Sequence, residues 1–118
     1  MASSYVHATA RDFARFGLLY LRDGVWDGTR VLPEGWVDHA RRLRSIDPDD
    51  GRGYGAQWWV TGDEHGSFWA NGYEGQSVPV SPALDLVVVR LGRTDAAHSA
   101  DLLAWRRDVV EAFARRNV

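Results

Sequence analysis

FWANGYEGQ, residues 68–76, separates two segments that have the composition of β-strands. Ser67–Ala70 precedes the two glycines and Gln76–Val80 follows them, and both segments contain residues that favour strands. Gly72 and Gly75 interrupt what would otherwise be one strand, and glycine inside a strand marks a bulge, a bend or a close approach to the backbone. Two interpretations are open: a hairpin corner in a structural sheet, or an exposed edge whose N–H groups bind a substrate carbonyl.

The N-terminal third of the chain predicts two helices joined by a small hairpin. The first helix is expected over about Thr9–Leu21, with Thr9 as its N-cap and Gly24 as a left-handed C-terminal cap. Asp-Gly at 27–28 lies between short apolar runs, which is typical of a tight hairpin turn. Pro33 fits the first position of the second helix. The apolar stripe of this helix is expected to comprise Trp36, Val37 and Ala40.

The rest of the chain predicts a polar loop, strands and a final helix. Residues 46–52 form the loop, and Gly55–Val60 is aromatic and β-prone. A strand over residues 84–91 contains Leu86–Val89, which does not alternate between apolar and polar residues, so we expect it to be buried on both faces. The final helix is expected over Ser99–Arg116 with Ser99 as its N-cap. One stripe of this helix is traced by Leu102, Trp105, Val109 and Phe113, with Arg106 and Arg107 lying off it.

This order of elements predicts an α+β fold in which an antiparallel sheet packs against helices, within one domain spanning residues 1–118. The net charge of -2 supplies no electrostatic attraction for nucleic acid. The apolar runs are far shorter than the ~20 residues that span a bilayer, and the first residues do not have the layout of a signal peptide. The sequence leaves the cellular location open. All 14 basic residues are arginine, so these residues contain no lysine for Schiff-base chemistry. They also contain no cysteine, which excludes thiol chemistry.

Several segments resemble β-lactamase-like serine hydrolases in the same order. Residues 3–17 (SSYVHATARDFARFG) are similar to a stretch downstream of the catalytic tyrosine of that family. The family includes class C β-lactamases, penicillin-binding peptidases, bacterial carboxylesterases and aminohexanoate-oligomer amidases. The other similar segments are DGVW (23–26), RVLPEGWV (30–37), YG (54–55), GYEGQ (72–76) and DLVVVR (85–90). The resemblance covers about residues 3–93 and implies the C-terminal part of the β-lactamase/transpeptidase-like fold.

The resemblance implies a substrate-binding edge without its nucleophile. In the family, a Ser-x-x-Lys nucleophile and a tyrosine motif act with a sheet-edge triplet, often Lys-Thr-Gly. Only the triplet has a counterpart here, Ala70-Asn71-Gly72, with Ala70 in place of lysine. The backbone N–H of Tyr73 then corresponds to one of two oxyanion-hole donors. The implied substrate-binding residues are Trp69, Ala70, Asn71, Gly72, Glu74, Gly75 and Gln76.

We therefore expect a C-terminal fragment of a hydrolase that cleaves an ester or amide through an acyl-serine intermediate, inactive on its own. Its expected partners are a small-molecule substrate and the missing N-terminal portion of the same fold. A sheet normally covered by that portion would be exposed and would favour self-association. The alternative is a non-catalytic module that binds a peptide or sugar through Trp58, Trp59 and Trp69.

The other candidate residues give no clear indication of a functional site. The four histidines are scattered without metal-ligand spacing and are expected to be surface or hydrogen-bonded residues, so no metal or cofactor is expected. Ser77 and Ser81 lack the glycine-flanked turn of a hydrolase nucleophile. Asp47, Asp49 and Asp50 lie in the polar loop, which is unsuited to fixed acid–base geometry.

Overall fold

The computed structural model describes residues 5–116, and within them it has an α+β architecture. The α-helices are α1 (Ala10–Leu21), α2 (Trp36–Ala40) and α3 (Ser99–Arg116). The strands are β1 (Val25–Trp26), β2 (Thr29–Arg30), β3 (Ser45–Ile46), β4 (Gly53–Tyr54), β5 (Trp59–Val60), β6 (Phe68–Asn71), β7 (Ser77–Ser81) and β8 (Leu86–Val87). Ser3 and Ser4, which open the first family-like segment, lie outside the described residues. None of the helices in the described range is long and apolar enough to cross a membrane.

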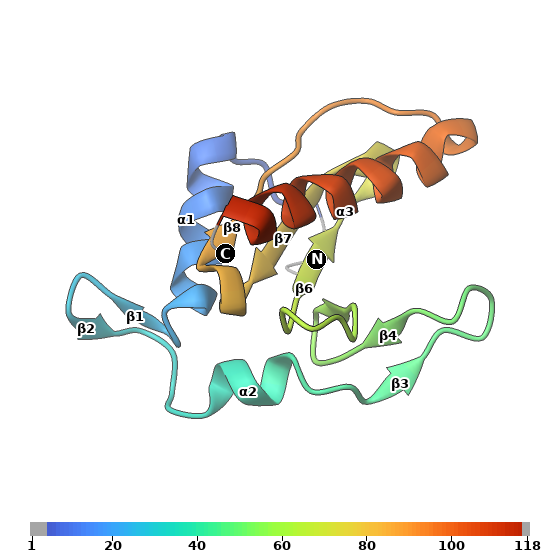
Figure 1. Ribbon diagram of the computed structural model, residues 1–118. Coiled ribbons are helices and arrows are strands. Elements are labelled where there is room, and N and C mark those ends of the chain that lie inside the picture. Colours follow the sequence, from blue (N-terminus) through green and yellow to red (C-terminus); the bar gives the residue numbers. More distant parts are fainter. Residues whose placement is uncertain (1–4, 117–118) are drawn as a thin grey trace.

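An antiparallel sheet of six strands, in the order β3-β4-β5-β6-β7-β8, forms the centre of the fold. Figure 1 shows α3 lying diagonally across one face of this sheet, with α1 beside β7 and β8. Alternate side chains of β6 define the two faces, because successive strand residues point in opposite directions. Phe68 packs in the core on the α1 side, whereas the Trp69 ring lies under Arg106 of α3. The sheet is therefore covered by a different helix on each face.

The main core lies between α1, α2 and the sheet. Phe68 and Val80 are 1% and 0% exposed, and Trp58 at 2% fills the space beside them. Tyr20 of α1 packs against Trp58 with ring centroids 4.7 Å apart, and Trp58 meets Phe68 edge to face at 4.9 Å. Such aromatic pairs add about 0.5–1.5 kcal/mol each beyond the burial of their surface.

The predicted first helix and hairpin are confirmed. The Thr9 hydroxyl accepts a hydrogen bond from the Asp12 backbone N–H at 3.1 Å, as expected of an N-cap. The C-terminal end is a two-residue Schellman arrangement, in which Asp23 and Gly24 both have positive φ and donate to the Tyr20 and Leu19 carbonyls. The prediction of Gly24 as the left-handed residue was thus incomplete, because Asp23 precedes it in the same conformation.

The second helix is shorter than predicted. It begins at Trp36 after Gly35, which has φ +78°, so Pro33 is not its first residue and that prediction was wrong. Pro33 instead accepts a turn hydrogen bond from the Trp36 N–H at 3.1 Å. Val37 and Ala40 are buried as predicted, but Trp36 remains 40% exposed.

Two strand predictions were wrong in extent. Gln57, with φ +71°, breaks the segment predicted as a strand over Gly55–Val60, and only Trp59 and Val60 join the sheet. The loop before them turns towards α2, where the Ala56 N–H donates to the Ala40 carbonyl at 2.8 Å. In residues 86–89 only Leu86 is buried, because β8 is the last strand of the sheet rather than a central one.

The final helix is confirmed, but its buried face differs from the predicted stripe. Ser99 is already helical, because a short 3-10 turn over Ala96–His98 precedes it, so Ser99 is not the N-cap. Trp105 and Phe113 are 42% and 40% exposed, whereas Val110 is buried and Arg106 lies over the sheet. The prediction for Arg106 was wrong because its planar guanidinium covers an indole ring while its charge stays at the rim.

Candidate functional site

The segment 72–76 is the corner of the β6–β7 hairpin. Asn71 pairs with Ser77, and the Gly72 N–H donates to the Gln76 carbonyl at 2.8 Å. The tip, Tyr73–Gly75, contains two consecutive left-handed residues, Glu74 at φ +60° and Gly75 at φ +89°. A Cβ atom at Gly75 would collide with Leu102 of α3 and with Arg90. The hairpin interpretation of the two glycines is therefore confirmed.

The same hairpin also carries an open backbone edge. β5 pairs only with Phe68 and Trp69, so within residues 5–116 no strand lies beside residues 70–72 on that side. Hydrogen-bonding directions alternate along a strand, and the Gly72 N–H points to β7, so the Asn71 backbone points to the open side. The Tyr73 N–H donates to no acceptor among residues 5–116. Tyr73 as a whole is 88% exposed, and its backbone carbonyl accepts a hydrogen bond from the Gln76 amide at 3.1 Å.

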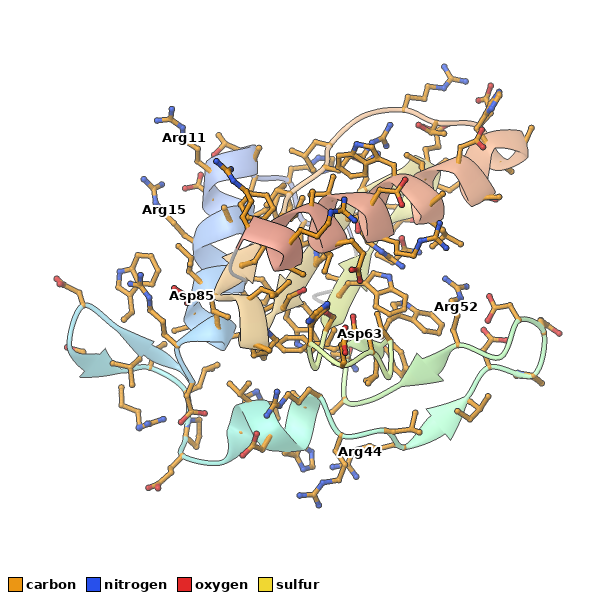
Figure 2. All side chains as sticks on the ribbon, viewed as in Figure 1. Arg11, Arg15, Arg44, Arg52, Asp63 and Asp85 are labelled. Carbon is orange, nitrogen blue, oxygen red and sulfur yellow. The ribbon has the colours of Figure 1, made fainter. Side chains whose placement is uncertain are left out.

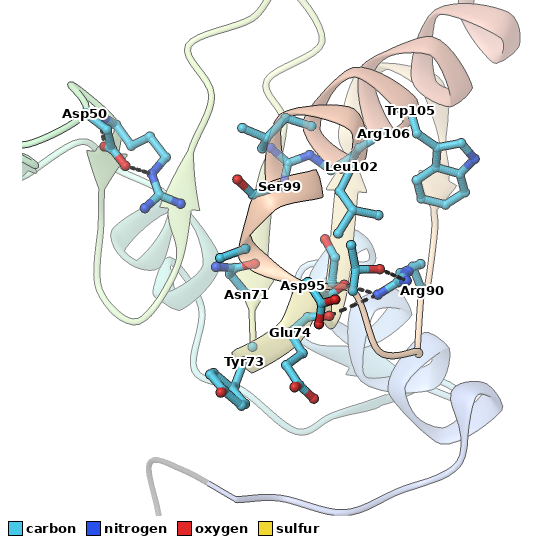
Figure 3. Close-up of a pocket in the computed structure, with 17 residues that line it drawn as sticks. Asp50, Asn71, Tyr73, Glu74, Arg90, Asp95, Ser99, Leu102, Trp105 and Arg106 are labelled. Carbon is cyan, nitrogen blue, oxygen red and sulfur yellow. Dashed lines mark hydrogen bonds and ion pairs between the residues drawn. The ribbon is translucent and has the colours of Figure 1, made fainter.

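The Arg90 guanidinium (Figure 3) and the Gln76 amide fix the hairpin tip from behind. The Arg90 guanidinium donates to the carbonyls of Glu74, Gly75 and Gly92 at 3.3, 3.0 and 2.7 Å. The Gln76 amide donates to the Tyr73 and Gly92 carbonyls and accepts from the Gly92 N–H at 2.9 Å. We call Arg90 and Gln76 the hairpin clamp. Arg90 ends the family-like segment 85–90, but nothing in the sequence alone marks it as part of the site.

A groove of about 420 Å³ lies between the hairpin tip, the start of α3 and the loop before β4. The groove is lined by Asp50, Arg52, Asn71, Gly72, Tyr73, Glu74, Gly75, Ser77, Arg90, Thr94, Asp95, Ala96, Ser99, Leu102, Leu103, Trp105 and Arg106. Five of the predicted site residues are among them, Asn71 to Gly75. The arginines of the loop and of α3 were not predicted, because nothing local in the sequence places them together.

The other predicted residues of this segment lie elsewhere. Trp69 is only 3% exposed and lies beneath α3, and Ala70 packs against the core on the opposite face. Gln76 lies behind the tip, where its amide group serves the clamp. The predicted roles of these residues in binding substrate stay predictions. Of the tryptophans in the alternative binding module, Trp58 and Trp69 are buried at 2% and 3% exposure, so they offer little open surface for stacking.

The charged side chains around the groove are not all in ion pairs within the described residues. Asp50 pairs with Arg52 at 2.5 Å, and Glu74 pairs with Arg93 at 3.2 Å. Arg106 forms no ion pair with any residue in the described part of the chain. Burial first, and then the nearby positive charge of Arg52, lower the pKa of Arg106 below its ordinary value. The guanidinium nevertheless stays protonated at neutral pH, because its ordinary pKa is so high.

The weaker candidates form no second site. No group of three or more metal-ligating side chains occurs within residues 5–116. Contrary to expectation, His65 is neither exposed nor hydrogen-bonded through Nε2. It is buried, its Nε2 has no hydrogen-bond partner among the described residues, and Glu111 lies 3.5 Å away. Ser81 is buried and bonded to Ser67 at 2.7 Å. Asp47 and Asp50 cap backbone N–H groups of their own loop.

Comparison with known proteins gives two related matches. The 6-aminohexanoate-dimer hydrolase of Paenarthrobacter ureafaciens is 38% identical over 99 aligned positions, which cover 76% of this chain and 25% of the relative. A solved structure from Bacillus anthracis, assigned the name 6-aminohexanoate-dimer hydrolase, superposes with a TM-score of 0.68 at 29% identity, covering 89% of this chain and 30% of the other. No family model matches the chain.

The chain thus spans about a quarter of the length of the curated relative it matches. One match is in sequence and the other is in fold, and both carry the name of the same kind of hydrolase. This chain is therefore a homologue of proteins named 6-aminohexanoate-dimer hydrolase, of the β-lactamase-like serine hydrolase family, and is similar to their C-terminal part.

Proposed function

We propose that this chain forms the substrate-binding edge of a serine hydrolase that cleaves an amide or ester through an acyl-serine intermediate. The observation that carries the proposal is the Tyr73 N–H, which has no acceptor among the described residues and follows directly on the open edge of β6. A backbone donor held by a rigid hairpin is suited to a developing oxyanion, because it needs no reorganisation during the reaction.

In this mechanism the substrate lies along the open edge with its carbonyl oxygen towards the Tyr73 N–H. A serine oxygen attacks the carbonyl carbon and passes its proton to a base, and the carbonyl π electrons move to oxygen. The Tyr73 N–H and a second donor stabilise that oxyanion. Its collapse breaks the C–N or C–O bond, and the leaving group takes the proton. Water then releases the acid from the acyl-serine by the same steps.

The nucleophile and base in this proposal are supplied outside the 118 residues. The chain contains no lysine, so it has no Ser-x-x-Lys sequence. The chain spans 25% of its relative, whose remaining length offers room for these groups. We accordingly expect the purified chain to leave a p-nitrophenyl ester unhydrolysed. Turnover that a serine-directed phosphonate abolishes would contradict this assignment.

The substrate class we propose is a linear amide. Both relatives carry the name 6-aminohexanoate-dimer hydrolase, and that dimer is an unbranched amide. Ala70 stands where the family's triplet often has lysine, so the ammonium group that would hold a β-lactam carboxylate is missing. This substitution favours amide or ester substrates over β-lactams.

The backbone donor can be removed selectively by Tyr73→Pro. Gly72 has φ -130° and ψ 167°, an extended conformation that tolerates a following proline, and the Tyr73 N–H makes no internal hydrogen bond to lose. The test uses a chimera in which this chain replaces the matching segment of the Paenarthrobacter hydrolase. Tyr73→Pro should lower kcat about 10²–10³-fold in this chimera.

Tyr73→Ala is the matched control, because it removes the exposed ring and keeps the N–H. It should retain kcat for 6-aminohexanoate dimer. Equal kcat values for the Pro and Ala variants, with unchanged melting temperatures, would overturn the oxyanion assignment.

A further inference from the structure

Two arginines lie on a pair of stacked tryptophans beside the open edge. Trp59 of β5 and Trp69 of β6 are cross-strand neighbours whose ring centroids are 6.2 Å apart with planes inclined by 26°. The Arg52 guanidinium carbon lies 4.4 Å from the Trp59 ring centroid, and that of Arg106 lies 4.2 Å from the Trp69 ring centroid. The indole faces fix both planar cations through cation–π attraction.

These two cations face one groove and are not equally neutralised. Arg52 has Asp50 as its partner, whereas Arg106 has no carboxylate partner in the described part of the chain. Bringing a second cation near a half-buried arginine costs free energy unless an anion compensates it. An anion placed between the two guanidinium groups would remove that cost.

The floor of the groove offers a further polar group. Ser77 lines it, and the Ser77 Oγ is buried with no hydrogen-bond partner among residues 5–116. A hydroxyl can donate to an anion, so Ser77 adds a neutral donor to the two guanidinium groups. Asn71 lines the same groove, which places these groups next to the open edge of β6, where we propose that the substrate lies (Figure 3). Of the acidic lining residues, Asp50 and Glu74 are already paired with arginines, and Asp95 is the third.

We propose that this groove binds the carboxylate end of the substrate, with Arg106 as the principal cation, Arg52 as the second and Ser77 as an additional donor. Arginine suits this role because its guanidinium presents a planar fork that matches both carboxylate oxygens. That the ligand is a linear amide is taken from the hydrolase function proposed above. In the carboxylate site, Arg106 binds the end of the substrate that lies away from the reacting carbonyl.

Binding is tested on the unmodified 118-residue chain, without any hydrolytic step. Calorimetric titration compares N-acetyl-6-aminohexanoate, which has an amide and a carboxylate, with its methyl ester, which has lost only the charge. The acid should bind about tenfold more tightly than the ester, a difference of about 1.4 kcal/mol. Equal affinities for acid and ester would overturn the proposal, whatever the chimera does.

Variants then assign the site to its residues. Arg106→Gln should weaken binding of the acid about tenfold. Arg106→Lys keeps the charge without the fork and should weaken it less. Arg115→Gln removes an exposed arginine from the same helix at a position outside the groove and should leave affinity unchanged. If Arg106→Gln and Arg115→Gln weaken binding of the acid equally, the loss of affinity reflects only the change in net charge. That result would overturn the assignment.

Failure of the acid to bind, with the chimera active and sensitive to Tyr73→Pro, would reject the carboxylate site alone. Preferential binding of the acid, with Tyr73→Pro harmless, would reject the oxyanion assignment alone. If Arg106→Gln does not fold, the comparison of acid and ester on the unmodified chain still decides the question.

Discussion

The Nη1 atom of Arg90 lies 3.0 Å from the carbonyl oxygen of Gly75, so a side chain fifteen residues downstream holds the hairpin tip from behind. Arg90 also donates to Glu74 and Gly92, which ties the β6–β7 hairpin to the loop before α3. The position of the Tyr73 N–H therefore depends on a residue outside the family's triplet.

Arg90→Ala should destabilise the protein by about 1.5–3 kcal/mol, because it removes hydrogen bonds from a charged group to half-buried carbonyls. Amide hydrogen exchange should accelerate at Gly92 and Thr94, whose N–H groups donate to Gln76 and Glu74. Arg93→Ala is the control, since Arg93 is 79% exposed and within the described part of the chain pairs only with Glu74, and an exposed pair contributes about 0–1 kcal/mol. Equal effects of the two variants would contradict the clamp.

Gly17 allows α1 to lie directly on β8. A Cβ atom at Gly17 would stand 2.6 Å from Val87 Cγ1, closer than carbon atoms approach. Gly17→Ala should therefore destabilise the fold by about 1–3 kcal/mol despite the better helix propensity of alanine. Urea unfolding measures the change, and Val87→Ala in the same chain should recover part of it. Additive losses in the double variant would show that the two residues do not interact.

Asp63 should make stability fall in acid. Figure 2 shows Asp63 in the turn between β5 and β6, where its Oδ1 accepts from the Ser67 and His65 N–H groups at 2.8 and 3.1 Å. Burial alone would raise the pKa of Asp63. Hydrogen bonds from Ser67 and Thr61, together with the charge of His65, outweigh burial and hold the pKa below 3.8.

A folded-state pKa below the unfolded one means that the unfolded state binds more protons in this window. The contribution of Asp63 is therefore complete above the unfolded value and is lost as pH falls through the folded value. Asp63→Asn should flatten the stability profile below about pH 4. Parallel profiles for the variant and the unmodified chain would contradict this expectation.

Exposed apolar side chains of α3 should promote self-association. Leu103, Trp105 and Phe113 are 46%, 42% and 40% exposed, and within the described residues β8 has no strand on its outer side. Sedimentation should show an average mass that rises with concentration. Trp105→Glu should lower that mass more than Val31→Glu, a control at a 58% exposed apolar position away from the helix. A monomer at all concentrations would refute the prediction.

Local chemistry in the sequence determined much of the secondary structure. Thr9 caps α1 because its hydroxyl reaches an N–H three residues away, and Asp27-Gly28 forms the β1–β2 turn because both residues adopt positive φ. The order of the predicted helices and strands likewise predicted the α+β fold, and the family-like segments, taken in order, indicated the family. The cap and the turn depend only on groups close together in the chain.

Only the tertiary structure decided what the side chains of the groove do. Arg106 was expected off the apolar face of α3, yet it lies on Trp69, because an indole from a strand 37 positions earlier is there to receive it. Gln76 and Arg90 meet at Gly92, a contact that follows from strand pairing and not from spacing. The segment 68–76 by itself identified a glycine-bearing strand edge. Whether that edge is open, held and flanked by cations depends on residues that come together only when the sheet has formed.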